Sequence, residues 1–215
     1  KVANVNDTII QLNLSNTSVP ENSSVGTLVG LLSSVDGDSG STFTYGFSGG
    51  DSSSFRISND SLLTKTVFDY ETKKSYSIDI YSADGGIVGG DTLIRTFSIT
   101  VTNTNDAPTD IFISDSIVSE NDSTHVVVGH FNTEDQDSGS SFTYELITGE
   151  GSTDNASFSI TDSTLYVEIP LEYETDSIYS IRVKSTDNGT PGESIEKVFS
   201  IYVAKANDTP QVVLQ

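Results

Sequence analysis

The sequence predicts an all-β protein built as two tandem antiparallel β-sandwiches, each of about 100 residues and about seven strands. Three observations support this prediction. Apolar residues alternate with polar ones, turn residues recur roughly every ten positions, and the chain of 215 residues repeats itself once at domain length. The abundant Ser, Thr, Asp, Asn and Gly suit short strands and turns better than helices.

The repeat is marked by an Asn-Asp tetrad. The sequence Asn-Thr-Asn-Asp stands at 103–106, Asn-Val-Asn-Asp at 4–7, and a weaker copy, Lys-Ala-Asn-Asp, at 205–208. Successive copies are 99 and 102 residues apart, which is the length of a domain. We therefore expect a first domain at 1–106 with a linker motif at 103–108, a second domain at 107–208, and a linker or the start of a further repeat at 209–215.

Five further segments recur in the same order in both halves of the chain. The pairs are Pro20-Glu21-Asn22 with Ser119-Glu120-Asn121, 36–45 with 135–144, 68–72 with 171–175, 76–80 with 179–183, and 97–101 with 199–203. Their offsets lie between 99 and 103 residues, so the halves differ by small insertions, which surface loops tolerate.

The last two segments of each set have the periodicity of strands. In the first half, Tyr76, Ile78 and Ile80 alternate with polar or amphipathic residues, and the segment 97–101 behaves in the same way. Alternate side chains of a strand point to opposite faces, so we expect the apolar set to lie in the core. No stretch has a sustained helical period.

Charge and composition exclude several classes of function. The 31 acidic and 10 basic residues give a net charge of −21, which disfavours nucleic acid and anionic membranes and favours divalent cations. The absence of cysteine excludes disulfides and thiolate sites. Apolar runs are too short to span a membrane. The chain begins directly with repeat sequence, so we expect it to come from the middle of a longer protein.

The acidic residues come in sets at loops and strand ends, and these sets carry a resemblance. The motifs Pro-Glu-Asn, Asp-x-Asp, Asp-x-Glu, Ala-Asp-Gly and Asn-x-Asn-Asp-Ala-Pro follow one another in order, and a variant of most of them recurs in the second half. In this respect the whole chain resembles two tandem cadherin-type repeats of the bacterial kind. The resemblance implies a Greek-key, immunoglobulin-like sandwich in each half and calcium bound where repeats meet.

The resemblance also implies a set of ligands for each joint. At the central joint the metal ligands are expected to be Glu21, Asp69, Glu71, Asn105, Asp106, Asp135, Asp137 and Asp187. Weaker outer half-sites are expected from Asn6, Asp7, Asp36, Asp38 and Asp84 at one end, and from Glu120, Glu172, Glu174, Asn207 and Asp208 at the other. Glu172 and Lys205 depart from the family pattern at the last half-site.

Charge counting supports a metal at the central joint independently. Its seven carboxylates would repel one another strongly without cations. Ca²⁺ takes about 6–8 oxygen ligands, so the set suits about two or three ions. Mg²⁺ prefers fewer protein ligands, and zinc is disfavoured by the lack of cysteine and usable histidine. His125 and His130 lie five residues apart, which predicts opposite faces of a strand and no joint metal site.

The sequence therefore predicts a calcium-stiffened structural module from a large extracellular or cell-surface protein that mediates cell adhesion. Its expected partners are adjacent cadherin-like repeats. The alternative is a module that binds polysaccharide or, homophilically, another cadherin-like protein. An enzyme is not expected. Gly37-Asp38-Ser39-Gly40 resembles a serine protease motif, but the first half contains no histidine to act as its base.

Overall fold

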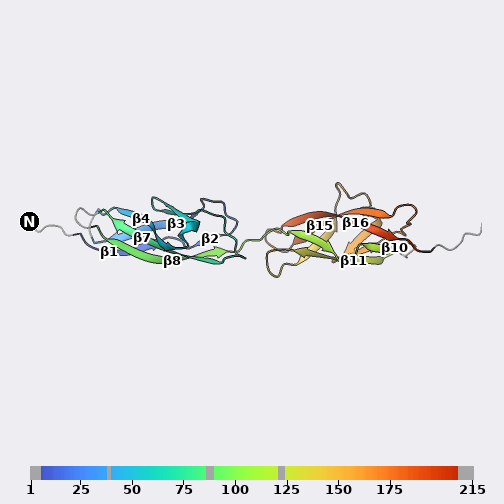
Figure 1. The fold of residues 1–215 in the computed structure, drawn as a ribbon, viewed down its shortest axis with the longest axis horizontal. Coiled ribbons are helices and arrows are strands. Elements are labelled where there is room, and N and C mark those ends of the chain that lie inside the picture. Colours follow the sequence, from blue (N-terminus) through green and yellow to red (C-terminus); the bar gives the residue numbers. More distant parts are fainter. Residues whose placement is uncertain (1–5, 38–39, 86–89, 121–123, 208–215) are drawn as a thin grey trace, which may run out of the picture. The chain divides into compact units, whose positions relative to one another are not determined.

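The computed structural model describes residues 6–37, 40–85, 90–120 and 124–207. The chain divides into two compact units, unit 1 at Lys1–Thr104 and unit 2 at Asn105–Gln215. Figure 1 shows the strands of both units, with the long neighbouring pairs β7–β8 in unit 1 and β15–β16 in unit 2. Among the described residues, no helix has the length and apolar character needed to cross a membrane.

Unit 1 contains two four-stranded sheets. The first has the order β1 (Ile9–Leu14), β3 (Leu28–Asp36), β6 (Ser61–Thr64) and β5 (Phe55–Ser58). The second has the order β2 (Ser18–Pro20), β8 (Thr92–Thr102), β7 (Ser75–Asp84) and β4 (Phe43–Gly50). A single 3₁₀ turn at Ser52–Ser54 joins β4 to β5.

Unit 2 repeats this arrangement strand for strand. Its first sheet has the order β9 (Asp110–Ile113), β11 (Val126–Glu134), β14 (Thr164–Val167) and β13 (Phe158–Thr161). Its second sheet has the order β10 (Ile117–Ser119), β16 (Ser194–Ala204), β15 (Ile178–Asp187) and β12 (Phe142–Leu146), and a 3₁₀ turn lies at Asn155–Ser157. The all-β, two-sandwich prediction is therefore confirmed.

The strand pairing differs from the prediction in one detail. Each unit has eight described strands where about seven were expected, because its first strand is broken in two. In unit 1, β1 joins one sheet and β2 crosses to the other, where it pairs parallel with β8. In unit 2, β10 pairs parallel with β16 in the same way. The remaining pairs are antiparallel, as the sequence predicts.

The cores are formed by the alternating apolar residues. In unit 1, Ile78, Ile80 and Ile99 are fully buried, and Ser98 and Thr100 on the opposite face of β8 are exposed. These positions confirm the period-two prediction for 76–80 and 97–101. Each unit has its own cluster of buried apolar residues, so each buries a core of its own.

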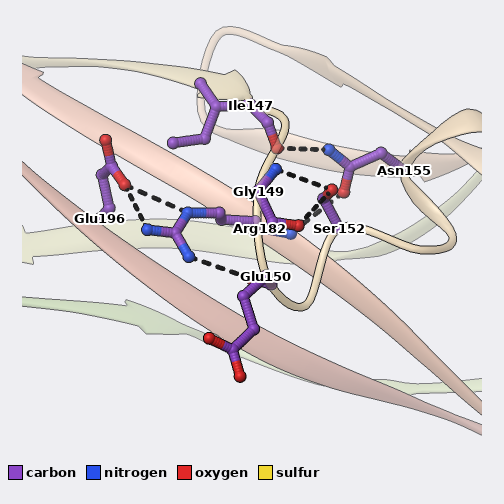
Figure 2. Close-up of polar contacts among 7 residues, drawn as sticks. All are labelled: Ile147, Gly149, Glu150, Ser152, Asn155, Arg182 and Glu196. Atoms are coloured by element: carbon purple, nitrogen blue, oxygen red, sulfur yellow. Dashed lines mark hydrogen bonds and ion pairs between the residues drawn. The ribbon is translucent and has the colours of Figure 1, made fainter.

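The four-residue insertion in unit 2 lies in the loop between β12 and β13, and Arg182 is one of the residues that hold this loop in place. Nη1 of Arg182 donates to the carbonyl of Glu150 (3.0 Å), and Nε and Nη2 both donate to Oε2 of Glu196 (3.1 and 2.6 Å). Figure 2 shows the guanidinium between this carboxylate and the loop, with Asn155 tied to the carbonyl of Ile147. The equivalent residue in unit 1 is Asp79, which has no such loop to hold.

Candidate metal centre

Glu21 is the most buried acidic side chain of unit 1. It follows β2 directly, is only 2% exposed, and accepts hydrogen bonds from two backbone amides. Oε2 accepts from the N–H of Tyr70 (2.6 Å) and Oε1 from the N–H of Thr104 (2.9 Å). Both donors are neutral amides, which partly compensate the buried carboxylate without neutralising its charge. Glu21 therefore fixes a negative charge beside the last residue of unit 1.

The two other predicted ligands of unit 1 lie in the turn that follows Phe68. Carboxylate oxygens of Glu21 and Glu71 lie within 4.8 Å of one another, and Glu71 is exposed. Asp69 instead caps its own turn, because its oxygens accept from the N–H and the hydroxyl of Thr72, both at 2.8 Å. These hydrogen bonds hold the pKa of Asp69 below its ordinary value. Unit 1 thus brings two carboxylates together and orders a third through the turn.

Unit 2 supplies an Asp-x-Asp pair in the loop after β11. The N–H of Asp137 donates to Oδ1 of Asp135 (2.8 Å), and the N–H of Asp106 donates to Oδ2 of Asp137 (2.7 Å). The linker backbone is therefore bound to this loop, and Asp106, Asp135 and Asp137 are all half-buried. These residues lie in one neighbourhood although they are about 30 residues apart in sequence.

Asp187 ends β15 and is 7% exposed. Its Oδ2 accepts from Nδ2 of Asn105 (3.0 Å), and its Oδ1 accepts from the amides of Gly189 (2.9 Å) and Glu193 (3.0 Å). Burial alone would raise the pKa of Asp187, but the hydrogen bonds from Asn105 and the two amides outweigh it and lower the pKa. The structure thus places two predicted ligands, Asn105 and Asp187, in direct contact.

The pKa of Asp135 is raised, in contrast to that of Asp187. Oδ2 of Asp135 is buried and makes no hydrogen bond within the described part of the chain. Burial raises the pKa of Asp135, and the nearby charges of Asp137 and Asp187 raise it further against the hydrogen bond from the Asp137 amide. A buried carboxylate oxygen without a donor is costly unless something positive faces it. The charges of Asp137 and Asp187 lie near enough to act on Asp135, and its buried oxygen without a donor suits a hard cation with oxygen ligands.

The outer half-site of unit 1 repeats part of this geometry. Nδ2 of Asn6 donates to Oδ2 of Asp84 (3.0 Å), as Asn105 does to Asp187, and Asp84 is 9% exposed. Asp36 is half-buried and Asp7 is exposed. The predicted ligand Asp38 lies outside the described residues. This end therefore keeps the Asn–Asp contact that unit 2 uses.

The outer half-site of unit 2 keeps one feature of the central joint and loses another. Glu120 is 2% exposed and accepts from the amides of Tyr173 (3.0 Å) and Ala206 (2.6 Å), as Glu21 does in unit 1. Glu174, however, forms an ion pair with Lys205, which lowers its pKa. Glu172 and Asn207 are exposed, and Asp208 lies outside the described residues. Lys205, which departs from the family pattern, therefore forms an ion pair with Glu174, one of the predicted ligands.

Sequence reasoning missed three residues that shape the site in unit 2. Nδ2 of Asn105 also donates to the carbonyl of Pro191 (3.0 Å), and Glu193 donates its amide to Asp187. Gly189 is required for this packing, because a Cβ there would lie 1.7 Å from Oδ1 of Asn105. The signal in the sequence is the pair Asn188-Gly189, which is typical of a turn.

The prediction that the two histidines lie on opposite faces of a strand is wrong. The ring of His125 stacks on Tyr166 at 4.3 Å, and Nδ1 of His130 lies 3.0 Å from Oγ1 of Thr164. Thr164 and Tyr166 are alternate residues of β14, so both histidines lie on the same face of the sheet. A register shift in β11 between Val127 and Gly129 adds the residue that changes the alternation.

Comparison with known proteins identifies the family of these repeats. The family model of the cadherin domain matches residues 15–102 and 115–204. Protein dachsous of Drosophila melanogaster is 29% identical over 209 residues, covering 90% of this chain and 6% of that protein. Protocadherin gamma-A11 of Pan troglodytes is 31% identical over 227 positions, covering 98% of this chain and 24% of that protein. The chain thus spans less than a quarter of each relative's length.

Solved structures show the same fold. Human protocadherin-24 EC1-2 superposes with a TM-score of 0.71 at 21% identity, covering 94% of this chain and 100% of that one. Mouse cadherin-23 EC22-24 gives a TM-score of 0.66 at 20% identity, covering 92% and 67%. These matches do not separate a bacterial from an animal type of repeat. Together with the two matched domains they establish that the chain belongs to the cadherin family and consists of two cadherin domains in tandem.

Proposed function

We propose that the chain is a calcium-binding, calcium-stiffened adhesion module from the repeat region of a larger extracellular or cell-surface protein. The observation that carries the proposal is the buried Oδ2 of Asp135, which has no hydrogen-bond donor among the described residues and lies among other carboxylates. Cadherin domains generally bind calcium, and they occur in adhesion proteins such as the relatives named above.

In this proposal the ligands of the central joint come from both units. Glu21, Asp69 and Glu71 act from unit 1, and Asn105, Asp106, Asp135, Asp137 and Asp187 act from the linker and unit 2. The oxygen-only donor set and its negative charge favour Ca²⁺ over zinc, which prefers nitrogen and sulfur. Because ions held from two sides restrain a hinge, calcium binding would stiffen the chain. The outer half-sites would be completed by adjacent repeats.

Four of the proposed ligands of the central joint have distinct tasks. Glu21 and Asp187 are the most buried carboxylates of the set, and backbone amides fix their position. Asn105 contributes a neutral oxygen while its amide group holds Asp187. Asp135 is the group whose charge most needs a cation, because burial opposes its ionisation. Loss of Asp135 is therefore expected to affect calcium binding more than loss of an exposed acid.

The experiment is a calcium titration of the whole chain followed by calorimetry, thermal melting and small-angle scattering. A site filled at a hundredfold excess over its dissociation constant adds about 2.7 kcal/mol to the free energy of unfolding. Asp135→Asn should weaken calcium binding at least about tenfold, since it removes a buried charged ligand. The matched control is Asp162→Asn, because Asp162 is exposed in a turn with φ 53°, which asparagine also adopts.

Three results would contradict the proposal. The first is a wild-type melting temperature that calcium leaves unchanged. The second is a scattering profile that shows no gain in extension on adding calcium. The third is an Asp135→Asn variant that binds calcium as tightly as the Asp162→Asn control.

A further inference from the structure

The loop between β15 and β16 contains the one Asn-Gly pair of the sequence, Asn188-Gly189. Such a pair is chemically labile, because the main-chain nitrogen of the second residue can attack the side-chain amide carbon of the first. A side chain on the second residue shields this nitrogen and restricts the backbone, and glycine has none. Every other asparagine of the chain is followed by a residue with a side chain. The sequence therefore singles out Asn188 as the most reactive side-chain amide.

The fold places a proton acceptor at the attacking nitrogen. The N–H of Gly189 donates to Oδ1 of Asp187 (2.9 Å), which also accepts from the N–H of Glu193 (3.0 Å). The proton of Gly189 must leave before its nitrogen can attack, and a general base acts from hydrogen-bond distance. The carboxylate of Asp187 therefore lies where such a base is needed.

The fold also places a hydrogen-bond donor at the oxygen of the reacting amide. The N–H of Ser141 donates to Oδ1 of Asn188 (2.9 Å). Attack on Cγ of Asn188 puts negative charge on Oδ1, and a backbone N–H aimed at that oxygen stabilises the charge as it develops. Asn188 is exposed, so water has access to the amide. A base, an oxyanion donor and water are thus all within reach of one labile bond.

Unit 1 lacks this arrangement at the equivalent loop. Asp84 corresponds to Asp187, and Gly85 stands where unit 2 has Asn188, so there is no side-chain amide to attack. The N–H of Gly85 donates to the carbonyl of Thr42 (3.2 Å) and not to a carboxylate. Oδ1 of Asp84 accepts instead from the N–H of Asp91 (2.8 Å). The reactive pair and its surroundings are therefore a property of unit 2.

We propose that Asn188 is a site of spontaneous deamidation in the folded chain, which converts it to aspartate and isoaspartate. The nitrogen of Gly189 forms a bond to Cγ of Asn188 while the bond from Cγ to Nδ2 breaks. The proton of the Gly189 amide passes by way of Asp187 to Nδ2, which leaves as ammonia. Water then opens the five-membered cyclic imide at one of its two carbonyls. Opening at one carbonyl gives aspartate, and opening at the other gives isoaspartate.

The isoaspartate product disturbs the contact between Asn105 and Asp187. Its main chain runs through Cβ and is therefore one carbon longer just before Gly189. Gly189 packs so closely that a Cβ on it would lie 1.7 Å from Oδ1 of Asn105. A lengthened main chain shifts Gly189 against Asn105, whose Nδ2 donates to Asp187 (3.0 Å). The product also adds a carboxylate beside Asp187, and like charges repel. Deamidation should therefore loosen the hydrogen bond between Asn105 and Asp187.

The test is peptide mapping by mass spectrometry after the whole chain has been incubated at mildly alkaline pH. Trypsin releases residues 185–197, in which Asn188 is the only asparagine. This peptide should gain the mass of an amide-to-acid conversion and separate into aspartate and isoaspartate forms on chromatography. A chain digested without incubation corrects for conversion during digestion. EDTA is present throughout, so the result does not depend on the proposed calcium site.

The matched control lies in the same sample. Residues 57–65 form a second tryptic peptide whose only asparagine is Asn59. Asn59 is also exposed in a turn, with φ 55°, but it is followed by Asp60 in place of glycine. Asn59 should convert at least about tenfold more slowly than Asn188. Equal rates at the two asparagines would overturn the proposal.

A synthetic peptide of residues 185–197 gives the rate without the fold. The whole chain should convert faster than this peptide or no more than about tenfold more slowly, because unit 2 keeps the base and the oxyanion donor in place. Conversion of the chain more than about tenfold slower than the peptide would overturn the proposal, since the folded loop would then block the attack.

The effect on Asn105 is tested with Asn188→Gln. The longer side chain would have to close a six-membered ring, so this variant should not convert during the incubation. The NMR signals of the Asn105 side-chain amide should shift in incubated wild type in proportion to the isoaspartate formed, and they should stay unchanged in incubated Asn188→Gln. Isoaspartate at position 188 with unmoved Asn105 signals would overturn the inferred disturbance of that contact.

Discussion

The contact between Asn105 and Gly189 gives the sharpest prediction about unit 2. A Cβ built on Gly189 would lie 1.7 Å from Oδ1 and 2.0 Å from Cγ of Asn105. Since no side chain tolerates such distances, Gly189→Ala must displace the asparagine. Its hydrogen bonds to the Asp187 carboxylate and to the carbonyl of Pro191 are then lost together.

The expected cost follows from these two hydrogen bonds. The one to a carboxylate is worth about 1.5–3 kcal/mol and the one to a carbonyl about 0.5–1.5 kcal/mol, so Gly189→Ala should lower the free energy of unfolding by about 2–4.5 kcal/mol. For a domain of this size the lower bound corresponds to a fall of about 8 °C in melting temperature. The control is Gly85→Ala in the loop after β7, whose Cβ would meet nothing nearer than 3.5 Å. It should change the melting temperature little.

A double-mutant cycle separates this clash from a general intolerance of alanine. Asn105→Ala alone should lower the free energy of unfolding by as much as Gly189→Ala does, since it removes the same hydrogen bonds. In the Asn105→Ala background the second substitution has no amide to displace, so most of its cost should vanish. Scanning calorimetry in EDTA measures all four proteins without a contribution from metal. Equal costs of Gly189→Ala in both backgrounds would refute the reasoning.

Three further predictions concern other parts of the chain. Arg182→Ala should lower the free energy of unfolding, measured in urea, by about 1–2 kcal/mol. It should also expose the loop at 147–154 to proteolysis. Arg182→Lys should restore only part of the lost stability, because lysine lacks the planar guanidinium with its several donors. Glu120→Ala should lower the free energy of unfolding, measured by calorimetry, by about 2–6 kcal/mol, because the amides of Tyr173 and Ala206 lose their acceptor. Intact protection of both amides in hydrogen exchange would contradict that assignment. The hydrogen bonds from Lys73 and a backbone amide lower the pKa of Asp51. The contribution of ionised Asp51 to the free energy of unfolding is therefore present above about pH 4 and lost as the pH falls through the pKa of the folded state. The difference in free energy of unfolding between wild type and Asp51→Asn should accordingly shrink as the pH is lowered.

The sequence by itself determined the fold to a large extent. Alternation at Ile78 and Ile80 placed the core residues correctly because a strand has only two faces and one of them is buried. The duplication gave two sandwiches because each repeat is long enough to bury its own core. The order of the acidic motifs gave the family, since loop positions in a repeated fold recur with the repeat.

Tertiary structure decided what sequence could not. Asn105 meets Asp187 across 82 residues, and only folding shows that Gly189 makes room for it. Burial of one oxygen of Asp135 depends on the packing around the loop rather than on the motif. A one-residue register shift placed both histidines on one face, against their spacing. Periodicity in a sequence reports local backbone geometry. Burial, bulges and long-range contacts arise instead from how the whole chain packs. The chemistry of the candidate site depends on this packing.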